Sequence, residues 1–437
     1  MTDMETIEAY LNRKHAELRL LNDCLRRPLT LPYPRSVTEV INHKFQLTAA
    51  LRSEHELYEW SATETAWSHE GRCAGGPFEF KYDYQRADLD VRGPSFYAIG
   101  DKAEYEAIYT ASGMAAISTL LFASANVIGE ADIFVLPGSY GETLELIAGH
   151  TRHLRLFTLP VKEATAPYSR PQILLLDSCT TASAFEGALR CIEPKFELLI
   201  FDTTCFAGSS GRIRRVLRWA QNYSIPVVMV RSHTKLDSLG AEYGRLGSAV
   251  FVPPDKNDRS SSLSKFEKLK AETRDAVRLF GNAALPAHFP PYVGRPSYRA
   301  LTNRRVAAIL RNGRRSALHF ASALTGLHAE VNFAHGLYLT LDSAQPLDER
   351  TARAAASQMS NDLRREGFPI RHAGSFGFDF AATEWFQHST TKRYSVRVAV
   401  ADLPTGLWDD LSRAVASWWA THGVMYGSAR GQMESLR

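Results

Sequence analysis

The sequence contains few cysteines and no long hydrophobic run, and these two shortages exclude several classes of protein. The five cysteines are an odd number without C-x-x-C spacing, which fits neither a disulfide framework nor a zinc site. The most apolar stretch, residues 115–128, is shorter than the roughly 20 residues that a bilayer requires. The first residues carry charges every few positions, unlike a signal peptide. We therefore expect a cytoplasmic protein without a membrane span.

An excess of charge of one sign is also lacking. The 51 Lys and Arg residues nearly balance the 47 Asp and Glu residues, so neither a nucleic acid nor an anionic membrane surface is an expected partner. The motifs of P-loop, zincin and α/β-hydrolase sites are absent as well. His150 and His153 have no third ligand nearby in the sequence, so no metal site is expected. With 45% hydrophobic residues among 437, the composition is that of a globular protein with a large core.

The amino-terminal region divides into a helical part and an irregular part. Apolar residues between Ile7 and Leu25 recur at helical spacing, which predicts an amphipathic helix that packs on the rest of the protein. From Val37 to about Ala98 the pattern is irregular and rich in aromatic residues and glycine. This pattern favours an extended arm that gains its order from packing elsewhere, including on a partner subunit.

After about residue 100, short apolar runs alternate with helical stretches. Continuous β-branched runs between helices indicate strands buried on both faces, hence a parallel sheet with helical crossovers and an α/β fold. These runs are 133–136, 154–159, 173–176, 198–201, 227–230 and 249–252. A long charged helix and a boundary loop are expected within 253–296. Helices near 298–326, 349–366 and 405–421, with strands at 337–341 and 396–400, predict a smaller α+β domain.

Polar residues that could carry chemistry stand where these segments begin or end. Ser112, Gly113 and Met114 open a helix, and the N–H groups of a helix amino terminus suit an anion such as phosphate. A simple helix cap by Ser112 explains the same residue. Tyr140 follows the first apolar run, at the edge of the sheet where ligands of open α/β folds bind. A lone tyrosine there is more often a packing residue.

Two further candidates follow later runs. Asp202 comes directly after the fourth run, and Ser232, Thr234 and Lys235 come after the fifth. A lysine in this place forms a Schiff base when burial and neighbouring cations lower its pKa. A solvated surface lysine is the alternative.

The order and spacing of these segments resemble the pyridoxal-phosphate enzymes of cysteine and methionine metabolism, the cystathionine γ-synthase and methionine γ-lyase family. That family carries Ser-Gly-Met-Ala-Ala-Ile, Tyr-Gly-x-Thr, an Asp at a strand end, and Ser-x-Thr-Lys, in this order. The resemblance spans roughly residues 80–437. The matching segments are Tyr84–Arg86, Ser112–Ile117, Tyr140–Thr143, Asp202, Ser232–Lys235, Ser375–Gly377 and Val396–Val400.

The resemblance implies the architecture of a fold-type I pyridoxal-phosphate transferase. This is a mostly parallel seven-stranded sheet sandwiched by helices, with a smaller α+β domain at the carboxyl end. Residues 1–85 would form the amino-terminal helix and an arm that reaches the neighbouring subunit's site. Residues 86–285 would form the large cofactor domain and 286–437 the small one. A homodimer or homotetramer with shared active sites is implied as well.

The resemblance also implies a role for each matched residue. Lys235 would hold pyridoxal 5'-phosphate as a Schiff base and move protons, and Asp202 would keep the ring nitrogen protonated. Tyr140 would stack on the ring and could protonate the leaving group. Arg397, with Ser375, would hold the substrate carboxylate. Phosphate contacts would come from Ser112, Gly113, Met114, Ser232 and Thr234 and, contributed by the neighbouring subunit, Tyr84 and Arg86.

The sequence departs from the family at two positions that bear on the site. The family's Glu-x-Pro-x-Asn motif, whose Asn contacts the ring hydroxyl, is here Asp177–Thr181, and Thr181 either replaces that contact or does not. Glu142 stands where the lyases usually carry a small residue or a cysteine facing the substrate side chain. Our hypothesis is that Glu142 selects a polar or cationic γ-substituent or serves as an extra acid or base. A solvated glutamate in the first turn of a helix is an equal alternative.

The expected function is a pyridoxal-phosphate-dependent lyase that acts on an L-amino acid with a γ-leaving group. Deprotonation at Cα and then Cβ would expel a sulfur, halide, acyl or phosphate group of a specialised substrate. One alternative is γ-replacement of the cystathionine γ-synthase type, and another is an aminotransferase or β-lyase on the same fold. A non-catalytic binding protein is a third alternative, against which the presence of both Lys235 and Arg397 argues.

Overall fold

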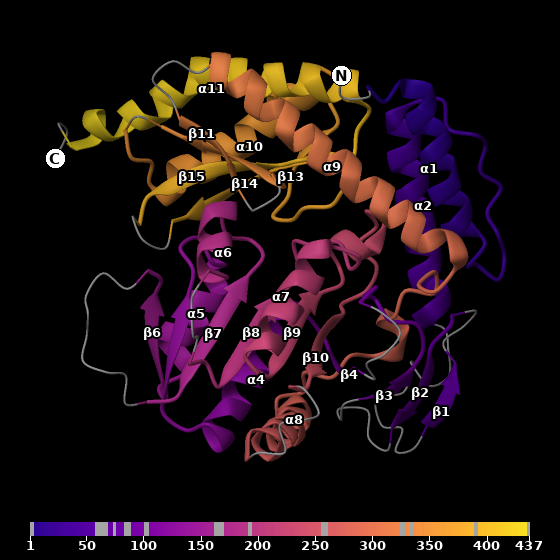
Figure 1. The fold of residues 1–437 in the computed structure, drawn as a ribbon. Helices are drawn as coiled ribbons and strands as arrows, with labels where there is room; N and C mark the ends of the chain where they lie inside the picture. Colours follow the sequence, from indigo (N-terminus) through magenta and orange to yellow (C-terminus); the bar gives the residue numbers. More distant parts are fainter. Residues whose placement is uncertain are drawn as a thin grey trace.

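Two sheets dominate the computed structural model, and the candidate residues lie where the two meet. In Figure 1 the larger sheet occupies the lower half and the carboxyl-terminal sheet the upper half. The boundaries expected at residues 85 and 285 stay predictions. The structure describes residues 4–56, 69–72, 76–82, 89–99, 105–160, 170–190, 195–254, 261–323, 328–332, 336–343, 345–388 and 392–434.

The larger sheet has seven strands in the order β4-β10-β9-β8-β7-β5-β6. The strands from β9 to β6 run parallel, and β10 is antiparallel to both of its neighbours. The prediction of a mostly parallel sheet is confirmed, and each predicted run forms a strand. The edge strand β4 was not predicted. The strands are β4 (Glu106–Thr110), β5 (Ala131–Val135), β6 (Leu154–Thr158), β7 (Gln172–Asp177), β8 (Leu198–Asp202), β9 (Val227–Ser232) and β10 (Gly247–Val252).

Helices cover both faces of this sheet, because alternate residues of a strand point to opposite sides. Ile133 of β5 packs with residues of α4 and α8, whereas its neighbour Phe134 packs with residues of α6 and α7. Burying one such side chain contributes roughly 1.5–3 kcal/mol, which explains the unbroken apolar runs. The helices are α4 (Gly113–Val127), α5 (Gly141–His150), α6 (Ala182–Ala188), α7 (Gly211–Asn222) and α8 (Ser261–Leu279).

The carboxyl-terminal sheet has five strands in the order β11-β12-β15-β14-β13. The predicted helices and strands of this region are confirmed, whereas β11, β13 and β14 were not predicted. Helix α9 runs diagonally across Figure 1 from α11 toward α1 and α2. The elements are α9 (Pro296–Ala323), β11 (His328–Asn332), β12 (Tyr338–Asp342), α10 (Glu349–Arg365), β13 (Ile370–His372), β14 (Ala381–Gln387), β15 (Tyr394–Ala399) and α11 (Thr405–Glu434).

The amino-terminal region corrects one prediction. The expected helix is present as α1 (Ile7–Asn22), but the segment after it, predicted as an irregular arm, begins with the 20-residue helix α2 (Val37–Glu56). The two helices pack side by side (Figure 1). Lys44 interrupts the apolar face of α2 in the sequence, yet it is buried because its Nζ pairs with Glu17 of α1 at 2.6 Å. A small antiparallel sheet contains β1 (His69–Arg72), β2 (Glu79–Tyr82) and β3 (Asp90–Arg92).

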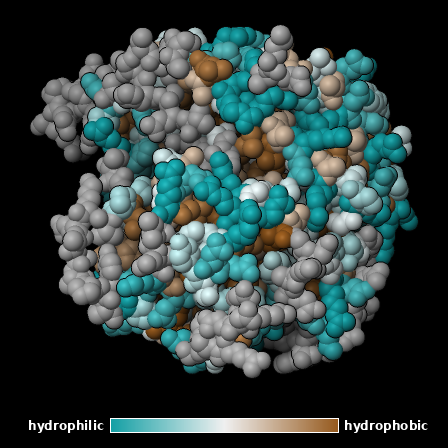
Figure 2. All heavy atoms as spheres, in the orientation of Figure 1, coloured by the Kyte–Doolittle hydropathy of each residue, from teal (hydrophilic) through white to brown (hydrophobic). Residues whose placement is uncertain are grey.

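The visible surface is mostly polar. On the face drawn in Figure 2, hydrophilic residues cover most of the coloured surface, and hydrophobic residues show in small separate areas. No helix in the described part of the chain is both long and apolar enough to cross a bilayer.

Candidate active site

Most of the predicted site residues line a single cavity of about 280 Å³. One side of it is formed at the carboxyl edge of the larger sheet, and the other by strands β12, β14 and β15. The sequence therefore predicted a set of side chains that the fold brings together from both sheets. The predicted residues in the lining are Ser112, Gly113, Met114, Tyr140, Asp202, Ser232, Thr234, Lys235, Ser375 and Arg397.

The amino terminus of α4 lies against the strands through two glycines. A Cβ on Gly113 would lie 2.9 Å from Cβ of Ser232, and one on Gly247 would lie 2.2 Å from the carbonyl oxygen of Ser112. This contact places the first turn of α4 beside the hydroxyls of Ser232 and Thr234, which are 3.0 Å apart. Ser112 itself caps the helix, its Oγ accepting a backbone N–H at 3.0 Å. Hydroxyls and a helix amino terminus together suit a phosphate group.

The loop that carries Ser232, Thr234 and Lys235 is anchored from its buried side. Arg231 donates to both carboxylate oxygens of Asp237, at 2.6 and 2.7 Å. Nδ1 of His233 lies 2.8 Å from the same carboxylate. Although burial opposes it, the Arg231 guanidinium lowers the pKa of Asp237 to about 2, so the pair stays ionised. Such bidentate pairs fix geometry, which holds the cavity-lining residues of this loop in place.

Lys235 contacts the carboxyl-terminal part of the chain through its amine. Nζ of Lys235 donates to Oγ of Ser375 at 2.5 Å, and Ser375 donates to Oε1 of Glu242 at 2.7 Å. The Glu242 carboxylate also lies 3.5 Å from Nζ of Lys235. Glu242 has a φ of +42°, a left-handed conformation that costs energy for a residue with a side chain. The sequence did not point to Glu242.

Asp202 shares its end of the sheet with a second carboxylate. Asp202 of β8 is in register with Asp177 of β7, and both side chains are buried. Burial and the negative charge of Asp177 raise the pKa of Asp202 to about 7. Asp177 accepts backbone N–H groups from Tyr140 at 2.9 Å and Cys179 at 2.8 Å, yet burial still raises its pKa. Two buried carboxylates this close cannot both ionise without a compensating cation.

Arg397 projects from β15 between two aromatic rings. Its guanidinium carbon lies 4.8 Å from the ring centre of Tyr338 and 4.1 Å from that of Phe386. Its Nη2 is 3.0 Å from Oε1 of Glu384, on the neighbouring strand β14. Cation–π contacts with the two rings hold the guanidinium at this place, and its planar fork of N–H donors suits bidentate binding of a carboxylate.

Three of the predicted residues, Tyr140, Glu142 and Thr181, are more exposed than the rest of the set or lie outside the cavity lining. Tyr140 lines the cavity but is 38% exposed, and burial together with the Glu142 carboxylate raises its pKa. Glu142 itself is exposed in the first turn of α5 and is not part of the lining. Thr181 lies outside the cavity lining as well, where its hydroxyl caps α6 by accepting an N–H at 3.3 Å. Asp177, from the same motif, is the residue that lines the cavity.

Several lining residues were not predicted. Thr204 follows Asp202 by two residues, and its hydroxyl accepts the Ser232 N–H at 3.0 Å. Thr204 could have been predicted from the sequence, because it is a polar residue just beyond the strand that ends at the candidate carboxylate Asp202. Tyr338 and Glu384 reach the cavity only through strand pairing with β15, which no sequence signal indicated. Tyr84 and Arg86, predicted to contact the phosphate of a neighbouring subunit, lie outside the described residues.

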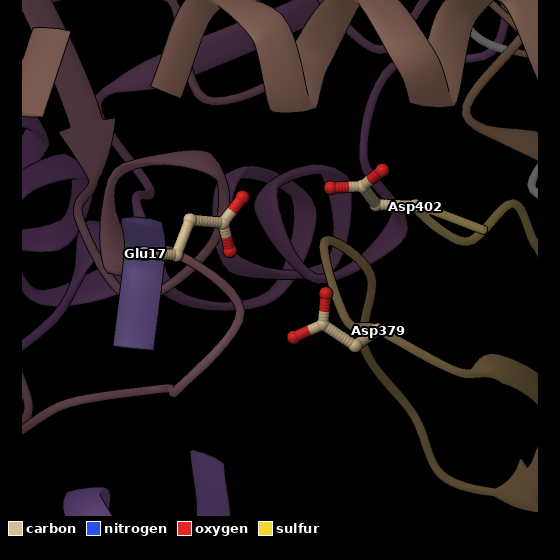
Figure 3. Close-up of side chains that lie close together, drawn as sticks. All are labelled: Glu17, Asp379 and Asp402. Carbon is tan, nitrogen blue, oxygen red and sulfur yellow. The ribbon is translucent and has the colours of Figure 1, made fainter. Parts of the chain in front are cut away.

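A second group of carboxylates has the spacing of a metal site. The carboxylates of Glu17, Asp379 and Asp402 turn toward one another, with oxygens within 4.8 Å (Figure 3). The Nζ of Lys14 lies among them, 3.1 Å from Glu17, 2.6 Å from Asp379 and 2.5 Å from Asp402. An ammonium therefore already occupies the position that a metal ion would take. The expectation that the chain holds no metal site stays a prediction.

No family model and no curated protein matches the chain. Among solved structures it is similar to a protein of Campylobacter jejuni described as an O-acetylhomoserine (thiol)-lyase, which contains N'-pyridoxyl-lysine-5'-monophosphate. The identity is 15%, the coverage 71% of this chain and 81% of that one, and the TM-score 0.44. O-acetylhomoserine sulfhydrylase of Wolinella succinogenes is 15% identical, with a coverage of 71% of this chain and 91% of that one and a TM-score of 0.46. An aminotransferase from Anaerococcus prevotii is 16% identical, with a coverage of 74% of this chain and 78% of that one and a TM-score of 0.45. Similarities at this level assign no activity or ligand to this chain.

Proposed function

We propose that the protein is a pyridoxal 5'-phosphate-dependent enzyme that eliminates a γ-leaving group from an L-amino acid. The observation that carries this proposal is the convergence of Lys235, Asp202 and Arg397 on the cavity that the amino terminus of α4 also lines. The amine of Lys235 suits the aldehyde of the cofactor, and the carboxylate of Asp202 suits its ring nitrogen. The guanidinium of Arg397 suits the substrate carboxylate, and the amino terminus of α4 suits the phosphate.

The residues present fit this cofactor. The pKa of Asp202, raised to about 7 by burial and Asp177, would be lowered by a cationic ring nitrogen beside it, which favours the ionised carboxylate. A Cβ on Gly113 would collide with Ser232, so this glycine keeps the α4 cradle against the hydroxyls that would contact the phosphate. The neighbouring subunit's contribution of Tyr84 and Arg86, and with it a homodimer or homotetramer, belongs to the same proposal.

When bound, the cofactor supplies a sink for the electrons of the broken Cα–H bond. Arg397 holds the α-carboxylate and thereby fixes which bond at Cα is aligned for cleavage. The Lys235 amine would take the Cα proton, pass it to the C4′ carbon of the cofactor, and as a free amine again take a Cβ proton. Its hydrogen bond to Ser375 directs it toward the substrate side of the cavity. Tyr140 keeps its proton because its pKa is raised, so it can protonate the leaving group when the Cγ bond breaks. Glu142, exposed beside Tyr140 and outside the cavity lining, is a further candidate acid or base.

The first test is covalent attachment of the cofactor. Purified protein incubated with pyridoxal phosphate is expected to absorb visible light, and borohydride reduction followed by peptide mapping should find the label on Lys235. Lys235→Ala should lose the label, and Lys195→Ala, which changes an exposed lysine, should keep it. Protein that binds no pyridoxal phosphate, or that carries the label elsewhere, contradicts the proposal.

Loaded protein then distinguishes the reactions. Elimination releases the γ-leaving group together with a keto acid and ammonia, whereas replacement retains the amino group and requires a second nucleophile. Keto acid that forms only with an amino acceptor identifies an aminotransferase instead. Loaded protein that neither releases a γ-leaving group from an L-amino acid nor transfers its amino group supports a binding protein.

A further inference from the structure

Arg397 shares its side of the cavity with Glu384. The two residues are directly opposite each other in the antiparallel pairing of β14 with β15, and Nη2 of Arg397 lies 3.0 Å from Oε1 of Glu384. Both side chains line the cavity and are mostly buried, with exposed fractions of 16% for Arg397 and 14% for Glu384. The residue proposed to hold the substrate carboxylate is therefore already paired with a carboxylate of the protein.

The second oxygen of Glu384 lies at the loop that contacts the candidate catalytic lysine. A Cβ on Gly374 would be 3.2 Å from Oε2 of Glu384, and the next residue, Ser375, accepts the hydrogen bond of Lys235 at 2.5 Å. Burial and the charge of Glu384 raise the pKa of Tyr338, which lines the same wall. Glu384 thus stands on the carboxyl-terminal side of the cavity, across from the α4 cradle, where the substrate is expected.

The balance of charge changes when a substrate binds. The lining carries the carboxylates of Asp177, Asp202 and Glu384 and the cations of Lys235 and Arg397. In the proposed function Asp202 pairs with the ring nitrogen, and Lys235 takes the Cα proton as an uncharged amine, so neither balances the charge of Glu384 when a substrate binds. The α-amino group of the substrate lies at the cofactor, so at the wall formed by β14 and β15 the substrate carboxylate and Glu384 set two carboxylates against the one guanidinium of Arg397. In a largely buried site an uncompensated charge is strongly unfavourable unless a cation balances it.

We infer that Glu384 binds a cationic group in the side chain of the substrate. The substrate class is therefore an L-amino acid with a second amino or guanidino group in its γ-substituent. In the free protein Glu384 pairs with Arg397, and in the complex it pairs with the cation of the substrate. This inference rests on the proposed function, since it requires Arg397 to hold the α-carboxylate.

The test uses ligands of similar shape that differ in charge. L-arginine and L-citrulline form one such pair, and L-ornithine and L-2,4-diaminobutyrate against L-norvaline extend the comparison to shorter cations. Each is titrated into protein loaded with pyridoxal phosphate, and the change in visible absorption gives the apparent Kd. We expect at least one cationic ligand to bind about tenfold more tightly than its neutral counterpart.

Three variants decide whether Glu384 causes this preference. Glu384→Gln should bind cationic and neutral ligands about equally, whereas Glu384→Asp should keep a preference for the cation. Glu145→Gln, which removes an exposed carboxylate of α5, should match the native protein. Circular dichroism and thermal unfolding check that each variant is folded. If Glu384→Gln does not fold, Glu384→Asp decides the inference, because its shorter side chain should reduce the preference, and a preference of native size would contradict the role of Glu384.

Two results would overturn the inference while leaving the proposed function intact. The first is equal affinity of loaded native protein for cationic and neutral ligands. The second is a gain in affinity of Glu384→Gln for every amino acid to the same degree, which would show that Glu384 only competes with the substrate for Arg397. Protein that binds no pyridoxal phosphate fails the proposed function itself, before this comparison begins.

Discussion

At the scale of the residue, Asp202 and Asp177 illustrate how the site differs from the core around it. Both are buried at the same level of adjacent strands, where the surrounding positions are apolar. Such a pair lowers stability when it ionises, and groups with strongly shifted pKa values concentrate at functional sites. The two carboxylates titrate as a pair, so replacing one of them also changes the titration of the other.

The first prediction concerns Asp202→Asn in cofactor-free protein. The pKa of Asp202 is about 7 in the folded state, above its unfolded value of 3.8, so the native protein loses stability as pH rises from about 4 to 7. The variant lacks this loss. Its stability relative to the native protein should therefore increase by about 1–3 kcal/mol between pH 5 and pH 8. Urea unfolding at both pH values measures the difference.

Asp275→Asn is a matched control, because Asp275 is a surface residue with an exposed fraction of 61%. It should show no such dependence on pH. A constant difference between Asp202→Asn and the native protein from pH 5 to pH 8 would contradict the raised pKa.

At the scale of the element, the position of α4 depends on a glycine rather than on helix propensity. Gly113 begins the helix, and its missing side chain allows a close approach to Ser232 of β9. A glycine in a helix otherwise lowers stability relative to alanine, so its presence at this contact indicates a requirement for space.

The second prediction compares two alanine substitutions. Gly113→Ala should push the start of α4 away from β9 and weaken binding of pyridoxal phosphate about tenfold or more, because the phosphate contacts shift. Gly149→Ala in α5 meets no atom within 4 Å, so it should keep native affinity. It should also gain up to about 1 kcal/mol in stability. Fluorescence titration with pyridoxal phosphate and urea unfolding measure both effects. Equal affinity of the two variants would be evidence against an anion cradle at α4.

At the scale of the whole molecule, a buried ionic cluster joins the amino-terminal helices to the carboxyl-terminal sheet. Lys14 of α1 and Lys44 of α2 meet Asp379 and Asp402, which belong to the carboxyl-terminal region. Arg305 of α9 pairs with Asp379 and donates to the carbonyl of Gly377 at 2.6 Å, two residues from Ser375. The cluster therefore holds in place the loop at Ser375–Gly377 that contacts Lys235. This loop is far in sequence from the amino terminus of α4.

The third prediction is that Lys14→Met destabilises the protein by about 3–5 kcal/mol, because three carboxylates lose the ammonium between them. Arg413→Met is the control, since its partner Asp410 is 58% exposed and such surface pairs contribute about 1 kcal/mol or less. Urea unfolding at pH 7 compares the two variants. Similar losses in both would show that the cluster does not contribute more than a surface ion pair.

The same cluster determines how stability responds to acid. Its neighbouring cations lower the pKa values of Glu17, Asp379 and Asp402 despite their burial. Folded pKa values below the unfolded ones contribute stability above about pH 4, and this contribution is lost as the pH falls further. In Lys14→Met the loss of stability on acidification should be smaller, because one of the cations that lowered these pKa values is gone.

By itself the sequence determined the strands β5 to β10 of the larger sheet, though not the edge strand β4, and the motif residues at their ends. Runs such as 227–230 are apolar throughout because both faces of a parallel sheet are buried, and Asp202 and Lys235 interrupt the pattern only where a strand ends. These signals are local, so they can be read without knowing the fold. The roles of Asp202 and Lys235 remain proposals.

The tertiary structure decided what depends on distant partners. Helix α2 was not predicted, and its Lys44 is buried only because Glu17 from another helix pairs with it. Glu384 gave no signal, because only the pairing of β14 with β15 places it beside Arg397. Charged residues are buried only where partners from elsewhere in the chain compensate them, and a linear pattern of polar and apolar residues does not record those partners.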